Sequence, residues 1–89
     1  MEEVVSKKIG KDSTIEEAIA YAFDLDGRMK CTDFNGVAHI IHLDGSTFTI
    51  KNAIIKRYGR FVVVYAEHQH PMVWFKDDLY RFGLTKYGV

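Results

Sequence analysis

Two short turn motifs, Asn35-Gly36 and Asp44-Gly45, constrain this sequence more than any other feature. Each motif lies between segments in which apolar and polar residues alternate, and such dipeptides favour two-residue type I′ turns between antiparallel strands. We therefore expect residues 28–34 to pair with 37–43, and residues 37–43 to pair in turn with 46–52. The sequence predicts that the middle of the chain is an antiparallel sheet.

Alternation along these strands predicts which face of the sheet is buried. With two-residue loops, Ile41 lies opposite Phe48. We expect the face with the larger apolar groups to form the core, and it carries Phe34, Val37, His39, Ile41, Leu43, Phe48 and Ile50. We expect the other face to be half-solvated, and it carries Met29, Cys31, Ala38, Ile40, His42, Thr47 and Thr49.

The pattern continues beyond these strands. The alternation breaks at Asn52-Ala53, which predicts a β-bulge or bend, and Tyr58-Gly59-Arg60 predicts the next turn. Residues 61–66 are apolar on both faces, which indicates a central strand or one covered on both sides. Residues 72–75 form the fifth predicted strand.

An amphipathic helix is predicted over residues 13–24. Ser13 and Glu16 have the spacing of a capping box, in which each side chain bonds to the backbone N–H of the other residue. The apolar residues repeat at helical spacing and form one stripe: Ile15, Ala18, Ile19, Ala22 and Phe23. The segment Asp24-Leu25-Asp26-Gly27 is expected to end the helix, with Gly27 able to adopt a positive φ.

These elements predict one α+β domain over residues 1–89. We expect one N-terminal amphipathic helix packed on a curved five-stranded antiparallel β-meander. The alternatives are a helix on the concave side of the sheet, which we favour, and a small SH3-like or OB-like open barrel. The remaining boundaries are a short edge strand or frayed terminus at 1–11, the meander at 28–76, a helical turn at 77–82 and a tail at 83–89.

Composition restricts the function classes. The 12 Lys and Arg residues balance 12 Asp and Glu residues, so the chain lacks the basic excess of a dedicated nucleic-acid-binding domain. Cys31 is the only cysteine, which fits a reducing compartment. The acidic N-terminal residues do not resemble a signal peptide, and no apolar run approaches ~18 residues. We expect a cytoplasmic protein.

Histidines are the first candidates for chemistry. His68 and His70, beside Glu67, have the spacing of two metal ligands, but a third ligand is not evident. His39 falls on the predicted core face, where it is either a hydrogen-bonded structural residue or a functional base. No nucleophile motif, calcium loop or phosphate-binding glycine loop is present. We therefore predict no enzyme activity, catalytic residue, metal or cofactor.

A basic and aromatic patch provides one binding hypothesis. Basic side chains interleaved with aromatic ones can contact phosphates and stack on bases. The patch comprises Lys51, Lys56, Arg57, Tyr58 and Arg60. It predicts, as an alternative function, a small nucleic-acid or nucleotide-binding domain, and the competing interpretation is an ordinary charged hairpin tip.

An aromatic cluster near the C-terminus provides the leading hypothesis. Tryptophan, tyrosine and arginine are enriched at the energetic centres of protein interfaces, and the predicted interface comprises Trp74, Phe75, Tyr80, Arg81 and Phe82. We expect a non-enzymatic binding or inhibitor-type module that contacts a protein partner or a second copy of itself. Such small domains are common among regulatory proteins and accessory proteins of viruses and mobile elements.

Overall fold

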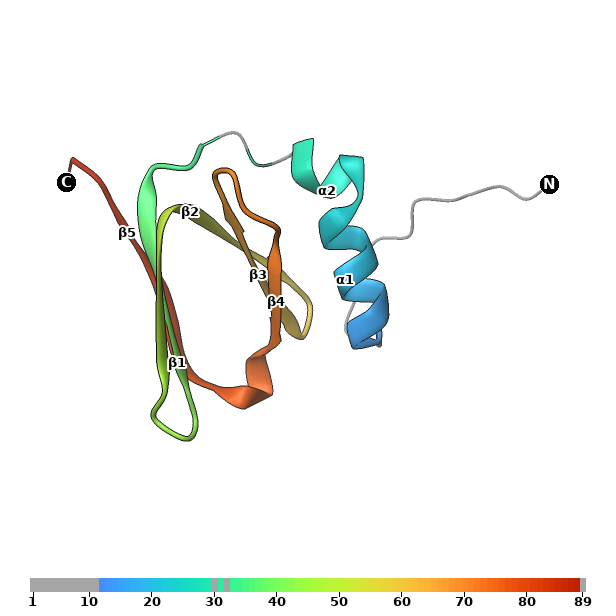
Figure 1. Cartoon of the computed structure of the whole chain (residues 1–89). Coiled ribbons are helices and arrows are strands. Elements are labelled where there is room, and N and C mark those ends of the chain that lie inside the picture. The colour runs from blue at the N-terminus through green and yellow to red at the C-terminus, as the bar shows by residue number, and fades with distance from the viewer. Residues whose placement is uncertain (1–11, 30, 32, 89) are drawn as a thin grey trace.

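The computed structural model describes residues 12–29, 31 and 33–88. The elements in chain order are α1 (Ile15–Phe23), α2 (Leu25–Met29), β1 (Gly36–His42), β2 (Thr47–Tyr58), β3 (Phe61–Ala66), β4 (Met72–Phe75), the 3₁₀ turn η1 (Lys76–Asp78) and β5 (Leu79–Lys86). The α+β class is confirmed: a main helix packs on a five-stranded antiparallel sheet with the strand order β4-β3-β2-β1-β5. The sheet is not closed into a barrel, and β4 and β5 are its end strands (Figure 1). The strand predicted within residues 1–11 lies outside the described residues.

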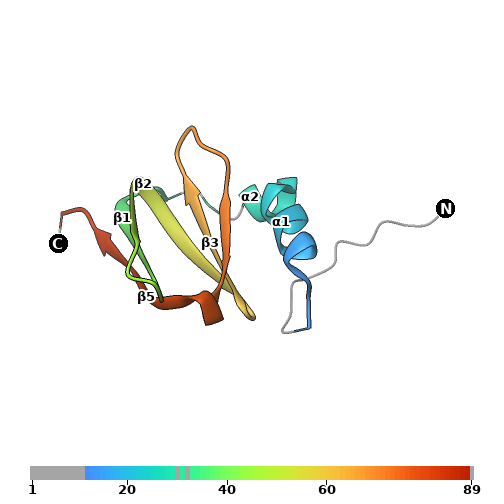
Figure 2. The same cartoon turned by 60° about the horizontal axis from the view of Figure 1, so that its bottom comes forward.

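The sheet is bent so that its two halves face each other (Figures 1 and 2). The long strand β2 belongs to both halves, since its first part pairs with β1 and its second part pairs with β3. The bend is at Asn52, which has a φ of 52°, and the β1–β2 register shifts opposite this point. The irregularity predicted at Asn52-Ala53 is therefore confirmed.

Two apolar layers result from this arrangement. The inner layer fills the space between the two halves of the sheet, and its buried residues are Ala38, Ile40, Ala53, Val62, Val64, Ala66 and Leu79. The helix layer lies between the helices and the other face of β2 and β3, and its buried residues are Ala22, Cys31, Val63 and Tyr65. Every residue of β3 is buried. The prediction that this strand is covered on both faces is confirmed, because alternate side chains enter alternate layers.

The helix α1 begins one residue later than the sequence pattern predicted. Thr14, rather than Ser13, is the N-cap: its hydroxyl accepts the Glu17 N–H at 3.2 Å, and Glu17 Oε1 accepts the Thr14 N–H at 2.9 Å. The helix ends at Phe23 with Asp24 as its C-cap, close to the predicted boundary at residue 24. Gly27 does not have the expected terminating role, because it lies within the second short helix, α2.

The helix lies on a different surface of the sheet from the one predicted. It packs on β4 and β3 from outside the bend, whereas β1 and β5 lie on the opposite side of these strands (Figure 1). The concave side is filled instead by the folded-over half of the sheet, which supplies the inner layer. The preferred placement of the helix in the concavity is therefore wrong.

Asn35-Gly36 does not form the predicted hairpin turn. None of the described residues in the range 28–34 lies in a strand, and Gly36 instead begins β1, where it pairs with both β2 and β5. A Cβ atom at Gly36 would lie 2.8 Å from the Thr85 carbonyl oxygen and 2.9 Å from Leu84 Cγ. The glycine is thus explained by the close approach of β5 rather than by a turn.

Asp44-Gly45 does turn the chain, but through three residues instead of two. The His42 N–H donates to the Ser46 carbonyl at 2.8 Å, which leaves residues 43–45 in the loop, and Gly45 has a φ of 93°. The Asp44 carboxylate accepts both the N–H and the hydroxyl of Ser46, at 2.9 and 2.7 Å. The extra loop residue moves the strand register by one position, so Ile40, not Ile41, lies opposite Phe48.

This one-residue shift reverses the predicted faces of β1. Ala38 and Ile40 are fully buried, whereas His39 is exposed and Phe48, opposite Ile40, is 52% exposed. Cys31, which was placed on the half-solvated face, is instead buried in the helix layer. The face assignment made from two-residue turns is wrong for these residues.

The C-terminal prediction also needs correction. A 3₁₀ turn covers only residues 76–78, and most of the segment predicted as a helical turn and tail is the strand β5. This strand returns to pair with β1, so the fifth strand of the sheet comes from residues 79–86 and not from residues 28–34. Phe82 and Leu84 of β5 pack against the inner layer.

Candidate functional site

The end strand β4 has an outer edge that no described strand covers. The Lys76 N–H donates to the Arg60 carbonyl at 2.8 Å, in register with the β3–β4 ladder. Because successive N–H groups point to opposite sides of a strand, those of Val73 and Phe75 are directed away from β3. The sequence of β4, Met72–Phe75, contains no charged residue or proline that would protect this edge.

Exposed apolar side chains of α1 continue this surface. The helix packs against β4, and Ile19 and Phe23, one turn apart, remain 43% and 42% exposed. The Phe23 ring stacks on His70, with 5.5 Å between the ring centroids, shortly before β4 begins. We call the outer edge of β4, together with Ile19 and Phe23, the β4 surface.

The other end strand, β5, is better protected. A bulge between its pairings with Ile41 and His42 leaves Tyr80 out of register, and the Tyr80 side chain is 73% exposed. Arg81 and Lys86 on the same strand are exposed. Bulges and charged residues both discourage the addition of another strand to a sheet edge.

The predicted aromatic interface is therefore divided between the two ends of the sheet. Trp74 and Phe75 belong to β4, whereas Tyr80, Arg81 and Phe82 belong to β5. Alternation sends Trp74 to the inner layer, and Phe75 packs on the opposite face at 4.8 Å from the Phe61 ring centroid. The use of these residues as an interface stays a prediction.

Trp74 takes part in an aromatic contact across the bend. Its ring centroid lies 6.2 Å from that of His42 and 6.0 Å from that of Phe48, which are 5.4 Å from each other. The three rings come from β4, β1 and β2. They link the β1–β2 hairpin to the other half of the sheet.

The residues of the predicted basic patch do not gather on one surface. Arg60 forms an ion pair with Asp77 at 3.2 Å, which offsets its charge. Arg57 lies on the inner face of β2, where its guanidinium carbon is 5.1 Å from the centre of the Phe82 ring. A cation of the protein itself therefore lies over one face of the Phe82 ring.

The other members of the patch point elsewhere. Lys56 is adjacent to Arg57 on β2 and therefore lies on its opposite face. Tyr58 packs against the helix layer, with its ring edge-on to Tyr21 at a centroid distance of 5.2 Å. Lys51 is exposed, on the other side of the Asn52 bend. Nucleic-acid or nucleotide binding by this set stays a prediction.

Among the described residues, the histidines do not form the metal site considered for His68 and His70, and His39 does not have the buried position expected of it. His39 is exposed rather than buried, and its Nε2 lies 3.2 Å from the Thr85 hydroxyl. His68 is 90% exposed and lies 4.0 Å from the Glu67 carboxylate, whereas His70 stacks on Phe23. No group of three or more histidine, cysteine, aspartate or glutamate residues in the described ranges has a metal-binding arrangement.

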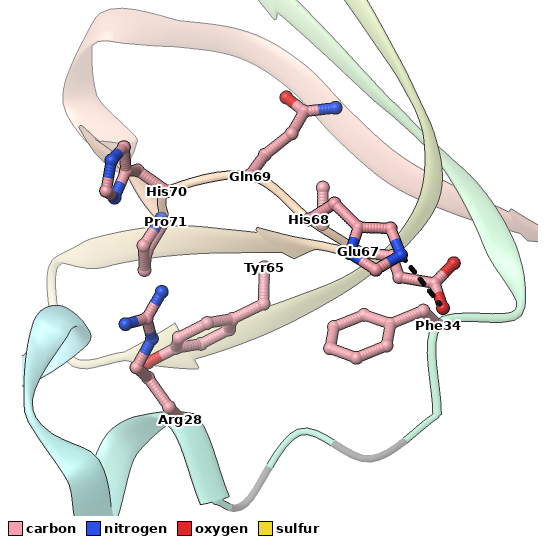
Figure 3. Close-up of a pocket in the computed structure, with 9 residues that line it drawn as sticks. Arg28, Phe34, Tyr65, Glu67, His68, Gln69, His70 and Pro71 are labelled. Atoms are coloured by element: carbon pink, nitrogen blue, oxygen red, sulfur yellow. Dashed lines mark ion pairs between the residues drawn. The ribbon is translucent and has the colours of Figure 1, made fainter.

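A cavity of about 320 Å³ lies between the β3–β4 turn on one side and Arg28 of α2 and Phe34, which precedes β1, on the other (Figure 3). Phe34, Tyr65 and Pro71 contribute its apolar walls, and Arg28 projects from α2 beside the Tyr65 ring. His68 and Gln69 form the turn above it. The cavity is at the lower end of the size range of small-molecule sites.

Tyr65, in the wall of this cavity, is 4% exposed. Burial, and secondarily the neighbouring Tyr58 hydroxyl, raises the pKa of Tyr65 well above its usual range. Burial also raises the pKa of the Cys31 thiol, and the positive charge of Lys56 opposes this shift. Both groups are therefore uncharged at neutral pH.

Comparisons with protein-family models, with curated proteins and with solved structures found no match to this chain. Among the described residues, no helix has both the length and the apolar character needed to cross a membrane.

Sequence reasoning missed both the β4 surface and the cavity. Ile19 and Phe23 belong to the apolar stripe, so the pattern predicted that they are buried. Only the small residues Ala18 and Ala22 of the stripe are fully covered, and their size could have indicated where the helix approaches the sheet most closely. The cavity joins Arg28 and Phe34 to a turn over 30 residues later, and no local pattern predicts that contact.

Proposed function

We propose that this protein is a non-enzymatic, cytoplasmic protein-interaction module that binds a partner by strand addition at the β4 surface. The observation that supports this most directly is the uncharged edge strand β4 beside the exposed side chains of Ile19 and Phe23. Strand addition uses main-chain hydrogen bonds for affinity and adjacent side-chain contacts for specificity.

The backbone of β4 supplies the polar part of the proposed interface. The Lys76 hydrogen bond implies that the N–H groups of Val73 and Phe75 point away from β3, which is the side on which a partner strand would pair. A four-residue strand forms few hydrogen bonds, and each contributes only about 0.5–1.5 kcal/mol net. The edge alone therefore does not account for a stable complex.

The exposed face of α1 supplies the apolar part. Ile19 and Phe23 are each more than 40% exposed, and burying such side chains contributes about 25 cal/mol per Å². Phe23 is fixed next to the start of β4 by its stacking on His70. A partner strand along β4 would thus contact the helix as well.

The partner that we propose is a second copy of this chain. A small domain buries a limited fraction of its surface and gains from further burial. Two geometries would use the β4 surface. The geometry that we favour pairs β4 with β4 of the other copy about a two-fold axis. A head-to-tail arrangement, in which β4 pairs with β5 of the next copy, is opposed by the Tyr80 bulge and the charged residues of β5.

Hydrogen exchange and molar mass together test this proposal. We expect the molar mass from light scattering to rise above that of the 10.2 kDa monomer with concentration. The Val73 and Phe75 amides should become protected over the same concentration range. A dimer that protects only β4 supports the two-fold geometry, and a larger assembly that also protects the outer edge of β5 supports the head-to-tail one. A monomer at 1 mM with fast exchange at both amides would reject self-association.

Substitutions on α1 distinguish specific self-association from non-specific hydrophobic association. We expect Phe23→Ser to weaken self-association by roughly tenfold, because it removes half-exposed apolar surface from the contact. Leu43→Ser is the matched control: Leu43 is 66% exposed, in the β1–β2 turn away from α1 (Figure 1). Equal effects of the two substitutions would show that α1 is not part of the interface.

A further inference from the structure

The cavity beside the β3–β4 turn combines features that the β4 surface does not use. It is an open hollow lined by residues that are distant in sequence: Arg28 of α2, Phe34 before β1, and the turn with His68 and Gln69 (Figure 3). Tyr65 and Pro71, both buried, contribute to its walls. Apart from His70, which also stacks on Phe23, the residues that line the cavity lie outside the β4 surface.

Its apolar surfaces suit a flat group. The Phe34 and Tyr65 rings flank the hollow from below, and the turn that carries His68 and Gln69 lies over it (Figure 3). Aromatic side chains stack with planar ligands at little conformational cost, because their own orientations are fixed by packing. Phe34 is fixed in this way, since it packs against the helix layer.

Its charges favour an anion. The Arg28 guanidinium is exposed next to the cavity, and no ion pair joins it to another described residue. The carboxylate in the lining, that of Glu67, lies instead beside His68 at 4.0 Å, on the opposite side from Arg28 (Figure 3). Guanidinium groups bind carboxylate and phosphate through two parallel hydrogen bonds.

We propose that this cavity binds a small aromatic anion, with its ring against Phe34 and Tyr65 and its carboxylate or phosphate on Arg28. The volume of about 320 Å³ accommodates a single-ring compound and not a polymer segment. The ligand class is thus a monocyclic aromatic carboxylate or phosphate monoester.

Phenyl phosphate and benzoate are the probes, and phenol and inorganic phosphate represent their separate halves. We expect two-dimensional NMR titrations of the full chain to shift the His68 and Gln69 amides, with a dissociation constant of about 1 mM or tighter for phenyl phosphate. Phenyl phosphate should bind at least about fivefold more tightly than phosphate or phenol. Equal affinity for phenyl phosphate and phosphate would leave only a surface anion site and overturn the proposal, as would shifts located elsewhere.

Variants test which side chain binds the anionic group of the ligand and which binds its ring. Arg28→Gln should weaken phenyl phosphate binding by about tenfold, because a charge-assisted hydrogen bond is lost, and Phe34→Leu should weaken phenyl phosphate more than inorganic phosphate. Lys86→Gln, which makes the same charge change on exposed β5, should bind like the wild type. If Arg28→Gln and Lys86→Gln weaken binding equally, the anion responds only to net charge and the site is not the one proposed. Unchanged amide spectra outside the cavity verify the fold of each variant.

Discussion

The hydroxyl of Tyr87 holds Asn52 in the left-handed backbone region, 35 residues earlier in the chain. It accepts the Asn52 N–H at 3.1 Å and donates to Asn52 Oδ1 at 3.0 Å. The Asn52 carbonyl in turn accepts the Glu67 N–H at 3.0 Å. The bend of β2 is therefore fixed both from the end of β5 and from the end of β3.

Replacing Tyr87 with phenylalanine should destabilise the fold by about 1–2 kcal/mol, because both hydrogen bonds to Asn52 are lost while the ring remains. Urea denaturation measures the change. Tyr80→Phe serves as the control, since Tyr80 is 73% exposed, and it should change stability by less than about 0.5 kcal/mol. Equal values for the two variants would show that the Tyr87 contact does not stabilise the bend.

Gly36→Ala should destabilise the protein by about 1–3 kcal/mol, because the new methyl group would meet the Thr85 carbonyl and Leu84 at under 3 Å. Gly83→Ala, on the neighbouring strand β5, adds the same methyl group where no atom lies within 4 Å. It should be close to neutral, or stabilising because it restricts the unfolded chain. Thermal or urea denaturation of the pair measures the difference, and similar losses in both variants would contradict the explanation given for Gly36.

Local signals in the sequence were reliable where one residue determines the geometry. Broken alternation predicted the irregularity at Asn52. Turn residues predicted the turn at Gly59-Arg60. Continuous apolar character predicted that residues 61–66 are buried on both faces. The Asp44-Gly45 turn was located correctly, but its length depends on the side-chain bonds of Asp44 to Ser46. The one extra residue in this loop determines which face of β1 is buried.

Long-range contacts explain the remaining errors. Gly36 has the sequence context of a turn, and only the return of β5 to β1 shows that its missing side chain makes room for another strand. The basic patch was inferred from adjacency along the chain, yet strand alternation separates Lys56 from Arg57, and Asp77 pairs with Arg60. The cavity beside Arg28 depends on tertiary packing alone.

Matched substitutions test the register of β1. Ile40→Val should cost about 0.5–1.5 kcal/mol, because Ile40 is fully buried in the inner layer. Ile41→Val removes the same methylene from the opposite, partly exposed face and should cost less. Urea denaturation at neutral pH compares them. A larger loss for Ile41→Val would favour the register with two-residue turns over the observed one.

The raised pKa of Tyr65 predicts that stability falls at alkaline pH. In the unfolded chain a tyrosine loses its proton near pH 10, whereas burial and the neighbouring Tyr58 hydroxyl keep Tyr65 protonated in the folded state. Above pH 10 the folded state therefore binds more protons than the unfolded state, and the free energy of unfolding decreases by up to about 1.4 kcal/mol per pH unit from this residue. The stabilisation is fully present below that pH.

Urea denaturation at intervals between pH 8 and pH 11 measures this slope, and Tyr65→Phe should reduce it by close to one proton. Tyr80→Phe should leave it unchanged, because Tyr80 is exposed. Cys31, whose pKa burial also raises, should contribute a second decrease that begins near pH 9 and disappears in Cys31→Ala. If Tyr65→Phe retains the full slope while Cys31→Ala does not, the alkaline sensitivity belongs to the thiol and Tyr65 is accessible to water.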